Sequence, residues 1–212
     1  SGPNGSGKSV LMKHLNGLLT PTSGEIVLDG ENILHDIKKT RQKIGLVFQD
    51  ADSQIVGQTV EKDTAFGPEN LKLDRDEITS RVENALKDVS LLDKRKFRPH
   101  ILSGGEKRRL AIAGVLAMNS PVLIFDEPFS NLDYPGVKNV LSQIVELHKK
   151  GHTIIVITHD LGKVLAHGKK LIIMKNGKIE HMGTPDELIE KLESCGIRKP
   201  ESDKIENMTW LK

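Results

Sequence analysis

The stretch LSGGEKRRLAIAGVLAMNSPVLIFDEP, residues 102–128, decides the fold of this chain. It opens on a Ser-Gly-Gly-Glu turn, continues into a helical segment over residues 104–118, and ends in the apolar run 122–125. A short apolar run of this kind, bounded by polar residues, is typical of a buried strand. The stretch therefore predicts a turn, a helix and a strand, and Asp126 and Glu127 stand at the end of that strand.

The flanking sequence repeats this alternation of apolar runs and helical patterns. Strands are expected at residues 25–28, 44–48, 122–126 and 153–157, a hairpin with an Asn-Gly turn at 171–182, and helices at 10–19, 134–150 and 185–192. The strands are too continuously apolar for burial on one face alone. They favour an α/β fold with a mainly parallel sheet that is covered on both faces.

Residues 49–105 differ in character from the rest of the chain. Charged residues become dense there, and apolar residues such as Ile78, Val82 and Leu86 recur at helical spacing. We expect a helical subdomain inserted into a core made of residues 1–48 and 106–182, followed by a C-terminal helix and tail over 183–212. The residues after Gly196 are polar and are expected to be loosely packed.

The chain opens on a phosphate-binding loop. Gly2 and the Gly7-Lys8-Ser9 group have the required spacing. Glycines let backbone N–H groups turn toward phosphates, Lys8 should reach the β- and γ-phosphates, and Ser9 should place its hydroxyl on Mg²⁺. The predicted nucleotide contacts of the loop are Gly2, Pro3, Asn4, Gly5, Ser6, Gly7, Lys8 and Ser9. Such a loop joins a strand to a helix, and no strand precedes it here, so the N-terminal strands are expected to be missing from this chain.

Asp126 and Glu127 suit two different tasks. Asp126 ends a strand and suits a ligand of Mg²⁺ or its water. Glu127 follows at once and points elsewhere, so its carboxylate can polarise a water that attacks the γ-phosphate, as a general base. A carboxylate pair that merely caps a strand end is the alternative, but the phosphate loop supplies the partner site.

The composition fits one soluble domain. The chain has 212 residues, 28% of them charged and 37% hydrophobic, with a net charge of +2. This balance gives no reason to expect nucleic acid as a partner. No apolar run approaches the ~20 residues of a membrane-spanning helix. The single cysteine, Cys195, cannot form an internal disulfide.

Together these motifs resemble the ATP-binding cassette (ABC) ATPases over essentially the whole chain. The resemblance implies a P-loop NTPase (RecA-like) fold, with ATP and Mg²⁺ bound. It implies roles for Gln49 in binding Mg²⁺ and water and in sensing a transport partner, for Asp133 in bridging two subunits, and for His159 in contacting the γ-phosphate. The Mg²⁺ set would then be Ser9, Gln49 and Asp126, and the catalytic set Glu127, His159 and Gln49.

The Ser-Gly-Gly-Glu turn takes its role from the same resemblance. Its N–H groups and hydroxyl suit an anion at a helix N-terminus. In the family, Ser103, Gly104, Gly105 and Glu106 serve the ATP held by the opposite subunit. A head-to-tail dimer of identical or paralogous ATPase subunits, with two composite sites, is therefore expected.

Within the family, the insert looks like that of energy-coupling factor (ECF) ATPases, the cobalt- and nickel-type importers included. The run from Val60 to Leu71, with Ala-Phe-Gly-Pro-Glu-Asn-Leu at its end, carries this resemblance. It implies a peripheral subunit on the cytoplasmic face of the cell membrane. A membrane subunit would dock near Gln49 and residues 50–71, and the solute, a metal ion or a vitamin such as biotin, would be captured by another protein.

Two other functions stay open at this stage. A soluble ABC ATPase could act on nucleic acid or ribosomes, although the insert is too short for a long coiled coil and the chain holds one cassette. A regulatory cassette could bind ATP without hydrolysing it, against which the intact Lys8, Asp126, Glu127 and His159 count.

Overall fold

A three-stranded parallel sheet forms the centre of the computed structural model, which describes residues 1–200 and 204–211. Strands β3 (Ile44–Val47), β4 (Val122–Asp126) and β5 (Thr153–Ile157) lie in that order, with Ile44 opposite Val122 and Val122 opposite Thr153. The strands predicted at 44–48, 122–126 and 153–157 and their parallel direction are confirmed. β3 and most of β4 are fully buried, because consecutive apolar side chains can only be accommodated when both faces are covered.

Helices cover the sheet on both faces. On one face, Met12 of α1 (Lys8–Leu15) packs against Ile44, Leu46 and Ile124. On the other face, α5 (Gly104–Ala117) and α6 (Tyr134–Lys149) enclose Val47, Leu123 and Phe125 in the main core. β5 is the exception to complete burial, because Thr153 and Ile155 remain exposed.

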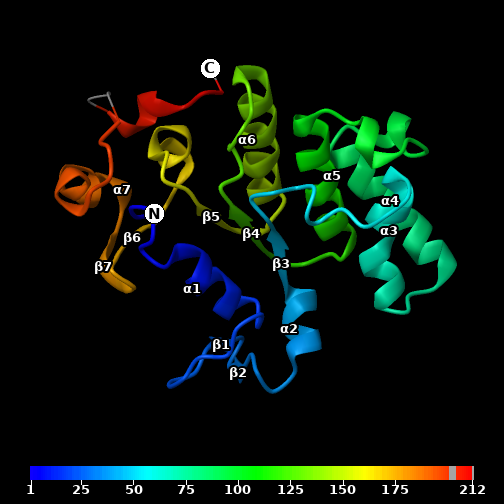
Figure 1. Cartoon of the computed structure of the whole chain (residues 1–212), viewed down its shortest axis with the longest axis horizontal. Coiled ribbons are helices and arrows are strands. Elements are labelled where there is room, and N and C mark those ends of the chain that lie inside the picture. The colour runs from blue at the N-terminus through cyan, green and yellow to red at the C-terminus, as the bar shows by residue number, and fades with distance from the viewer. Residues whose placement is uncertain (201–203, 212) are drawn as a thin grey trace.

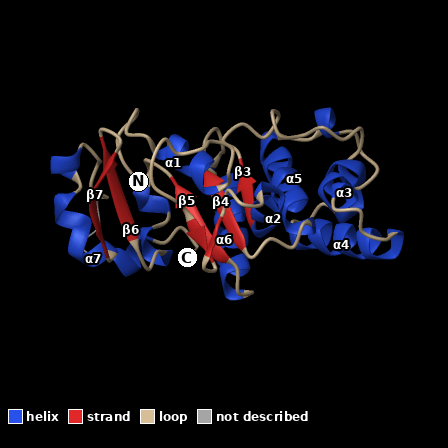
Figure 2. Ribbon diagram, turned by 90° about the horizontal axis from the view of Figure 1, so that it is seen from below, coloured by secondary structure: helices blue, strands red, loops and turns tan. Residues whose placement is uncertain are grey.

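The inserted segment folds into helices that pack beside the sheet (Figures 1 and 2). α3 (Val60–Asn70) and α4 (Arg75–Asp88) begin at Thr59 and Asp74, whose side chains accept hydrogen bonds from backbone N–H groups of the first turn. Both helices pack against α5. The sequence placed a boundary at 105/106, which divides α5. Because α5 packs against α3 and α4, residues 49–117 are called the helical unit below.

A smaller core lies at the opposite end of the sheet. The hairpin β6 (Leu171–Lys175) and β7 (Lys178–Gly183) turns at Asn176 and Gly177, both with positive φ, as the Asn-Gly prediction requires. Thr184 caps α7 (Pro185–Leu188) through a capping box. The predicted helix 185–192 is shorter than expected, because its second half continues as 3-10 turns at Ile189–Lys191 and Glu193–Cys195.

Residues 205–211 pack against the rest of the protein, which for this part corrects the expectation of a loose segment after Gly196. Ile205–Met208 forms a 3-10 turn, and Met208 is buried in the smaller core. Trp210 and Leu211 pack against the main core instead. A few apolar residues, here Met208, Trp210 and Leu211, thus attach a mostly polar segment to the rest of the protein. Residues 201–203 and 212 lie outside the described part.

The remaining elements are short. β1 (Val27–Leu28) and β2 (Glu31–Asn32) form a small antiparallel pair, so the expected strand 25–28 is only partly formed. α1 ends at Leu15 rather than Leu19, because Gly17 adopts a φ of 68°. α2 spans Ile37–Lys43, and further 3-10 turns occupy Leu92–Lys94, Pro99–Ile101, Leu161–Lys163 and Leu165–His167. Among the described residues, no helix has the length and apolar character needed to cross a membrane.

Candidate functional site

The glycine-rich loop 2–9 closes around the side chain of Lys8. The Lys8 ammonium donates hydrogen bonds to the carbonyl oxygens of Gly2, at 2.8 Å, and Pro3, at 2.9 Å. A Cβ atom at Gly2 would lie 2.3 Å from the Met174 carbonyl oxygen, so only glycine fits where the loop passes β6. Phosphate oxygens are stronger acceptors than carbonyl oxygens for this ammonium. The Lys8 ammonium is therefore available to exchange these carbonyl partners for the oxygens of an anionic ligand.

The start of α1 adds a second attraction for anions. Its N-cap residue, Gly7, has a φ of 95° and makes no side-chain cap, and the first turn contains no acidic residue. The backbone N–H groups at a helix N-terminus carry partial positive charge, and here no side chain of the cap neutralises them. The loop and the helix start together have the properties of a phosphate site.

Asp126 faces the first turn of α1. Its Oδ2 atom accepts a hydrogen bond from the Ser9 hydroxyl at 3.2 Å. Its Oδ1 atom is buried and has no hydrogen-bond partner among the described residues. Burial raises the pKa of the Asp126 carboxyl, the largest of the effects on it. A buried carboxylate oxygen without a donor, beside a hydroxyl, suits a hard cation such as Mg²⁺.

The described residues contain no group of three or more His, Cys, Asp or Glu that could hold a metal. Mg²⁺ is commonly bound through only one or two carboxylates together with substrate phosphates, and the pair of Ser9 and Asp126 fits this pattern.

Glu127 points away from Asp126 because of its backbone. Its φ is 44°, in the left-handed region that non-glycine residues seldom occupy, and its N–H extends the β4–β5 ladder by bonding the Ile157 carbonyl at 2.8 Å. The side chain then reaches the loop after β5. Its Oε1 atom lies 2.8 Å from His159 Nδ1 and accepts the His159 N–H at 3.0 Å, while Oε2 accepts the Thr158 hydroxyl at 3.1 Å.

These contacts bring together two residues that the sequence separates widely. The Glu127 side chain is 13% exposed and that of His159 is 63% exposed. A shielded carboxylate beside a solvent-facing imidazole can orient a water molecule and accept its proton. The strained backbone of Glu127 is kept in place only because the surrounding structure holds it, and residues strained in this way cluster at functional sites.

Gln49 lies exposed at the carboxyl end of β3, next to the edge where Asp126 ends β4. Two residues that the sequence did not single out fix this end of the strand. Gln54 accepts the Phe48 N–H at 3.0 Å, and Arg108 donates to the Phe48 carbonyl at 2.8 Å and to the Ser130 carbonyl at 3.4 Å. The sequence feature that could have indicated a buried Arg108 is its place beside the apolar residues of a helix.

The Ser-Gly-Gly-Glu turn makes its hydrogen bonds within the helical unit. Ser103 and Glu106 form a capping box at the start of α5, and Glu106 is paired with Lys94. The hydrogen bonds from Lys94 and from the Ser103 backbone lower the pKa of Glu106 to about 2. Ser103 and Gly104 are exposed, so their polar groups can meet a second molecule.

Asp133 caps another helix. Its Oδ1 atom accepts the Gly136 N–H at 2.9 Å, which starts α6, and the residue itself is exposed. The predicted subunit-bridging residue therefore lies on the surface and is held in place by its own helix.

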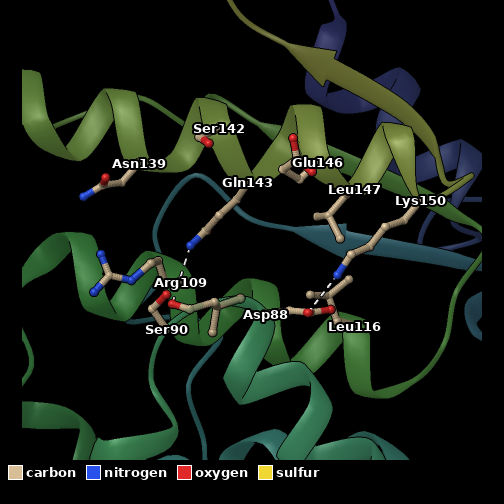
Figure 3. A pocket seen from close by; sticks show the side chains of 11 residues that line it. Asp88, Ser90, Arg109, Leu116, Asn139, Ser142, Gln143, Glu146, Leu147 and Lys150 are labelled. Atoms are coloured by element: carbon tan, nitrogen blue, oxygen red, sulfur yellow. Dashed lines mark hydrogen bonds and ion pairs between the residues drawn. The ribbon is translucent and has the colours of Figure 1, made fainter. Parts of the chain in front are cut away.

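The cleft drawn in Figure 3 is distinct from these groups. It encloses about 410 Å³ between α6 and the helical unit, and it contains none of the predicted nucleotide residues. The Lys150 ammonium and the Asp88 carboxylate span it at 2.7 Å, and the Gln143 amide donates to the Val89 carbonyl at 3.5 Å. The cleft lies where α6 of the core packs against the helical unit.

Known proteins resemble this chain over nearly all its length. A family model described as "ABC transporter" matches residues 1–130. The "Energy-coupling factor transporter ATP-binding protein EcfA" of Methanocaldococcus jannaschii is 46% identical over 205 residues, which are 94% of this chain and 74% of that protein. EcfA1 of Clostridium novyi is 44% identical over 210 residues, 96% of this chain and 75% of that protein.

Solved structures agree with these relatives. The structure of cbiO1 from Clostridium perfringens, described as part of the ABC transporter complex cbiONQ, has a TM-score of 0.81 and 42% identity, and the alignment covers 91% of this chain and 81% of cbiO1. A dimeric ATP-binding cassette, MJ0796, in a post-hydrolysis state with ADP and Pi, has a TM-score of 0.75 and 30% identity, with 86% of this chain and 82% of that chain covered.

Proposed function

Since the chain belongs to the ABC transporter family, among the ATP-binding subunits of the energy-coupling factor type, we propose that it hydrolyses ATP to drive the uptake of a solute by a membrane transporter. One observation carries this assignment. At the end of β4, two consecutive carboxylates have separate partners, Asp126 with Ser9 and Glu127 with His159. Such a division provides one group for the metal and one for the attacking water.

The residues of the chain then divide the work of hydrolysis. Loop 2–9 binds the phosphates through its backbone N–H groups, and Lys8 neutralises charge on the β- and γ-phosphates. Glu127 orients the attacking water and accepts its proton, and His159 holds the Glu127 carboxylate in place. Ser9, Asp126 and Gln49 would hold Mg²⁺, which would supply positive charge close to the phosphates.

The exposed turn at Ser103 requires a second ATPase subunit. Ser103 and Gly104 are exposed, and the Ser103 hydroxyl and N–H, which bond with Glu106 in the capping box, make no hydrogen bond outside the helical unit among the described residues. A second cassette, identical or paralogous, would bring its own nucleotide to this turn, while Asp133 would meet the partner across the same interface. Two sites per dimer follow from the two-fold symmetry.

A membrane subunit would dock on the insert near Gln49. Val56 is 63% exposed and Phe66 is 52% exposed, which leaves apolar surface for a partner helix. Asp63 lies within the same segment but is buried, and its Oδ1 atom accepts the N–H groups of Val56 and Gly57 at 2.8 Å. It shapes the loop that presents Val56. The solute, a metal ion or a vitamin, would be selected by another subunit, and the protein would lie on the cytoplasmic face of the membrane.

The variant Glu127→Gln tests this function. In the full-length protein assembled with its partners, ATP turnover should fall by ~10²-fold or more, while ATP affinity is retained. The control is Glu180→Gln, the same chemical change at an exposed position of β7. Normal turnover in Glu127→Gln would remove this residue from the mechanism, and an inactive wild-type protein that binds ATP would favour a regulatory cassette.

A further inference from the structure

Two segments of the proposed site, the connection from β4 to α6 and the turn after β5, place aromatic and basic side chains close together. Phe129 follows Glu127 by two positions, Tyr134 follows Asp133, and Lys163 lies in the turn after His159. The indole ring of Trp210, from the C-terminal tail, packs against two of these side chains. Its centroid lies 5.4 Å from that of the Tyr134 ring, and the Lys163 ammonium lies 5.4 Å from the Trp210 centroid and 5.8 Å from the Phe129 centroid.

The tail is fixed on both sides of this contact. Ile205 and Met208 pack in the smaller core, and Trp210 and Leu211 pack on the main core. The Thr209 hydroxyl lies 2.9 Å from His167 Nε2. Figure 1 shows the C-terminal end of the chain, in red, beside α6. The tail therefore bridges the two cores at the place where the site loops emerge.

Lys163 connects the indole to the loop after β5 that carries His159. Its ammonium pairs with the Asp160 carboxylate at 2.8 Å, and its side chain is only 16% exposed. A cation held over an aromatic face gains energy when it is shielded from water, so the indole favours one orientation of Lys163. Asp160 follows His159 directly, and the Lys163–Asp160 pair thereby restrains the backbone that presents His159 to Glu127.

We propose that Trp210 is a positioning residue for ATP hydrolysis, holding the loop from Glu127 to Asp133 and the His159 loop in their mutual arrangement. This inference rests on the proposed function. The indole touches no predicted nucleotide contact itself. It acts through Lys163 on the His159 loop and through Tyr134 on the start of α6, so it affects the geometry of the chemical step more than the binding of ATP.

A kinetic comparison separates positioning from packing. Trp210→Ala in the full-length, assembled protein should lower kcat by about tenfold and change the KM for ATP by less than about twofold. Trp210→Phe, which keeps a ring for Lys163 and Tyr134, should recover most of the activity. Leu211→Ala is the matched control, because Leu211 packs on the same core and no ring contact involves it.

A double-mutant cycle with Lys163 identifies the route. If the indole acts through Lys163, then Lys163→Gln and Trp210→Ala should each lower kcat, and the double variant should lose little more than either one. Independent, multiplicative losses would mean that Trp210 does not act through Lys163.

Fluorescence supplies a readout that does not depend on turnover. Trp210 is the one tryptophan of the sequence, and subtracting the emission of Trp210→Phe isolates its signal in the full-length protein. In a Glu127→Gln background, ATP with Mg²⁺ should shift this emission with the same concentration dependence as ATP binding, and Lys8→Ala should abolish the shift. If Trp210→Ala fails to fold, this measurement decides the matter.

The outcomes distinguish this inference from the proposed function. An active wild type together with unchanged kcat in Trp210→Ala, or an equal loss in Leu211→Ala, would overturn the positioning role alone. An emission that stays constant while ATP binds would do the same. A wild-type protein without ATPase activity would instead count against the proposed function.

Discussion

At the scale of single residues, neighbouring side chains acquire different chemistry from their surroundings. Asp126 is the last residue of a buried strand, so its carboxylate is desolvated and faces Ser9. Glu127 leaves the strand with a φ of 44°, which turns its side chain to His159 instead. The left-handed conformation is unfavourable for glutamate, and the hydrogen bonds to Thr158 and His159 help to offset that cost.

Arg108 is a residue whose importance only the packing reveals. It is 4% exposed, burial lowers its pKa, and it joins the carbonyl oxygens of Phe48 and Ser130. Arg108→Lys cannot reproduce both bonds from one planar group, and we expect a loss of about 1–3 kcal/mol in the free energy of unfolding. Turnover should fall as well, because Phe48 precedes Gln49 and Ser130 follows Glu127 closely.

Denaturant unfolding and ATPase assays measure these two effects. Arg109→Lys is the control at the adjacent, less buried position. If Arg108→Lys unfolds at the same denaturant concentration as the wild type, the buried bridge does not stabilise the protein.

At the scale of elements, the approach of α5 to β3 depends on a glycine. A Cβ atom at Gly45 would lie 2.0 Å from the Val115 Cγ1 atom. Val115 is β-branched and sits in a helix, so its side chain has little freedom to move away. Gly45→Ala should therefore destabilise the protein by about 1–3 kcal/mol.

A second substitution, at Val115, tests whether this contact is the cause of the destabilisation. Val115→Ala removes the clashing methyl group, so the double variant should be more stable than the sum of the two single effects predicts, by roughly 1 kcal/mol or more. Additive losses, measured by equilibrium unfolding, would show that the contact between α5 and β3 is not what excludes a side chain at Gly45.

The attachment of the tail should depend on pH. Burial lowers the pKa of His167 from its usual value of 6.5, and its ring contacts Thr209. As the pH falls below 6.5, His167 becomes protonated in the unfolded chain while it stays neutral in the folded protein. Proton binding then favours the unfolded state, so the free energy of unfolding is unaffected by His167 well above pH 6.5 and decreases as the pH falls below it.

Unfolding experiments at pH 7.5 and 5.5 can detect this change. The free energy of unfolding should decrease toward the lower pH, and His167→Gln should reduce the decrease, because glutamine does not titrate. His100→Gln, at an exposed histidine of the helical unit, should retain the wild-type decrease. An identical pH dependence in wild type and His167→Gln would exclude His167 as its source.

At the scale of the whole molecule, the groups that we propose for hydrolysis lie on two surfaces. The phosphate loop, Asp126 and Glu127 belong to the core, whereas Ser103 belongs to the helical unit. Ser103→Arg should block turnover but leave ATP binding to one subunit intact, and Lys8→Ala should abolish binding at its own loop. Neither variant should be active as a homodimer.

Mixing the two variants tests whether the sites are shared. A mixed dimer has one site with an intact Lys8 and an intact partner Ser103, so ATPase activity should reappear when the two proteins are combined. Activity that stays absent in every mixture, with mixed dimers shown by native mass spectrometry, would mean that each site is completed within one chain.

The sequence by itself determined the elements that depend on local pattern. The strands of residues 44–47, 122–126 and 153–157 were predicted because continuous apolar runs must be buried on both faces. The phosphate loop and the Asn-Gly turn were predicted because their glycines meet backbone requirements that few other residues satisfy. The family resemblance, which the comparisons confirm, rested on the same local motifs.

Only the tertiary structure decided the relations between distant segments. Glu127 and His159 meet because β4 and β5 are neighbours in the sheet, and Arg108 joins two loops because α5 crosses beneath both. The tail appeared loose in sequence, since polar residues surround Met208 and Trp210, yet each finds an apolar core to cover. A pattern along the chain records which side chains must be buried, whereas the partners that bury them are chosen by packing in three dimensions.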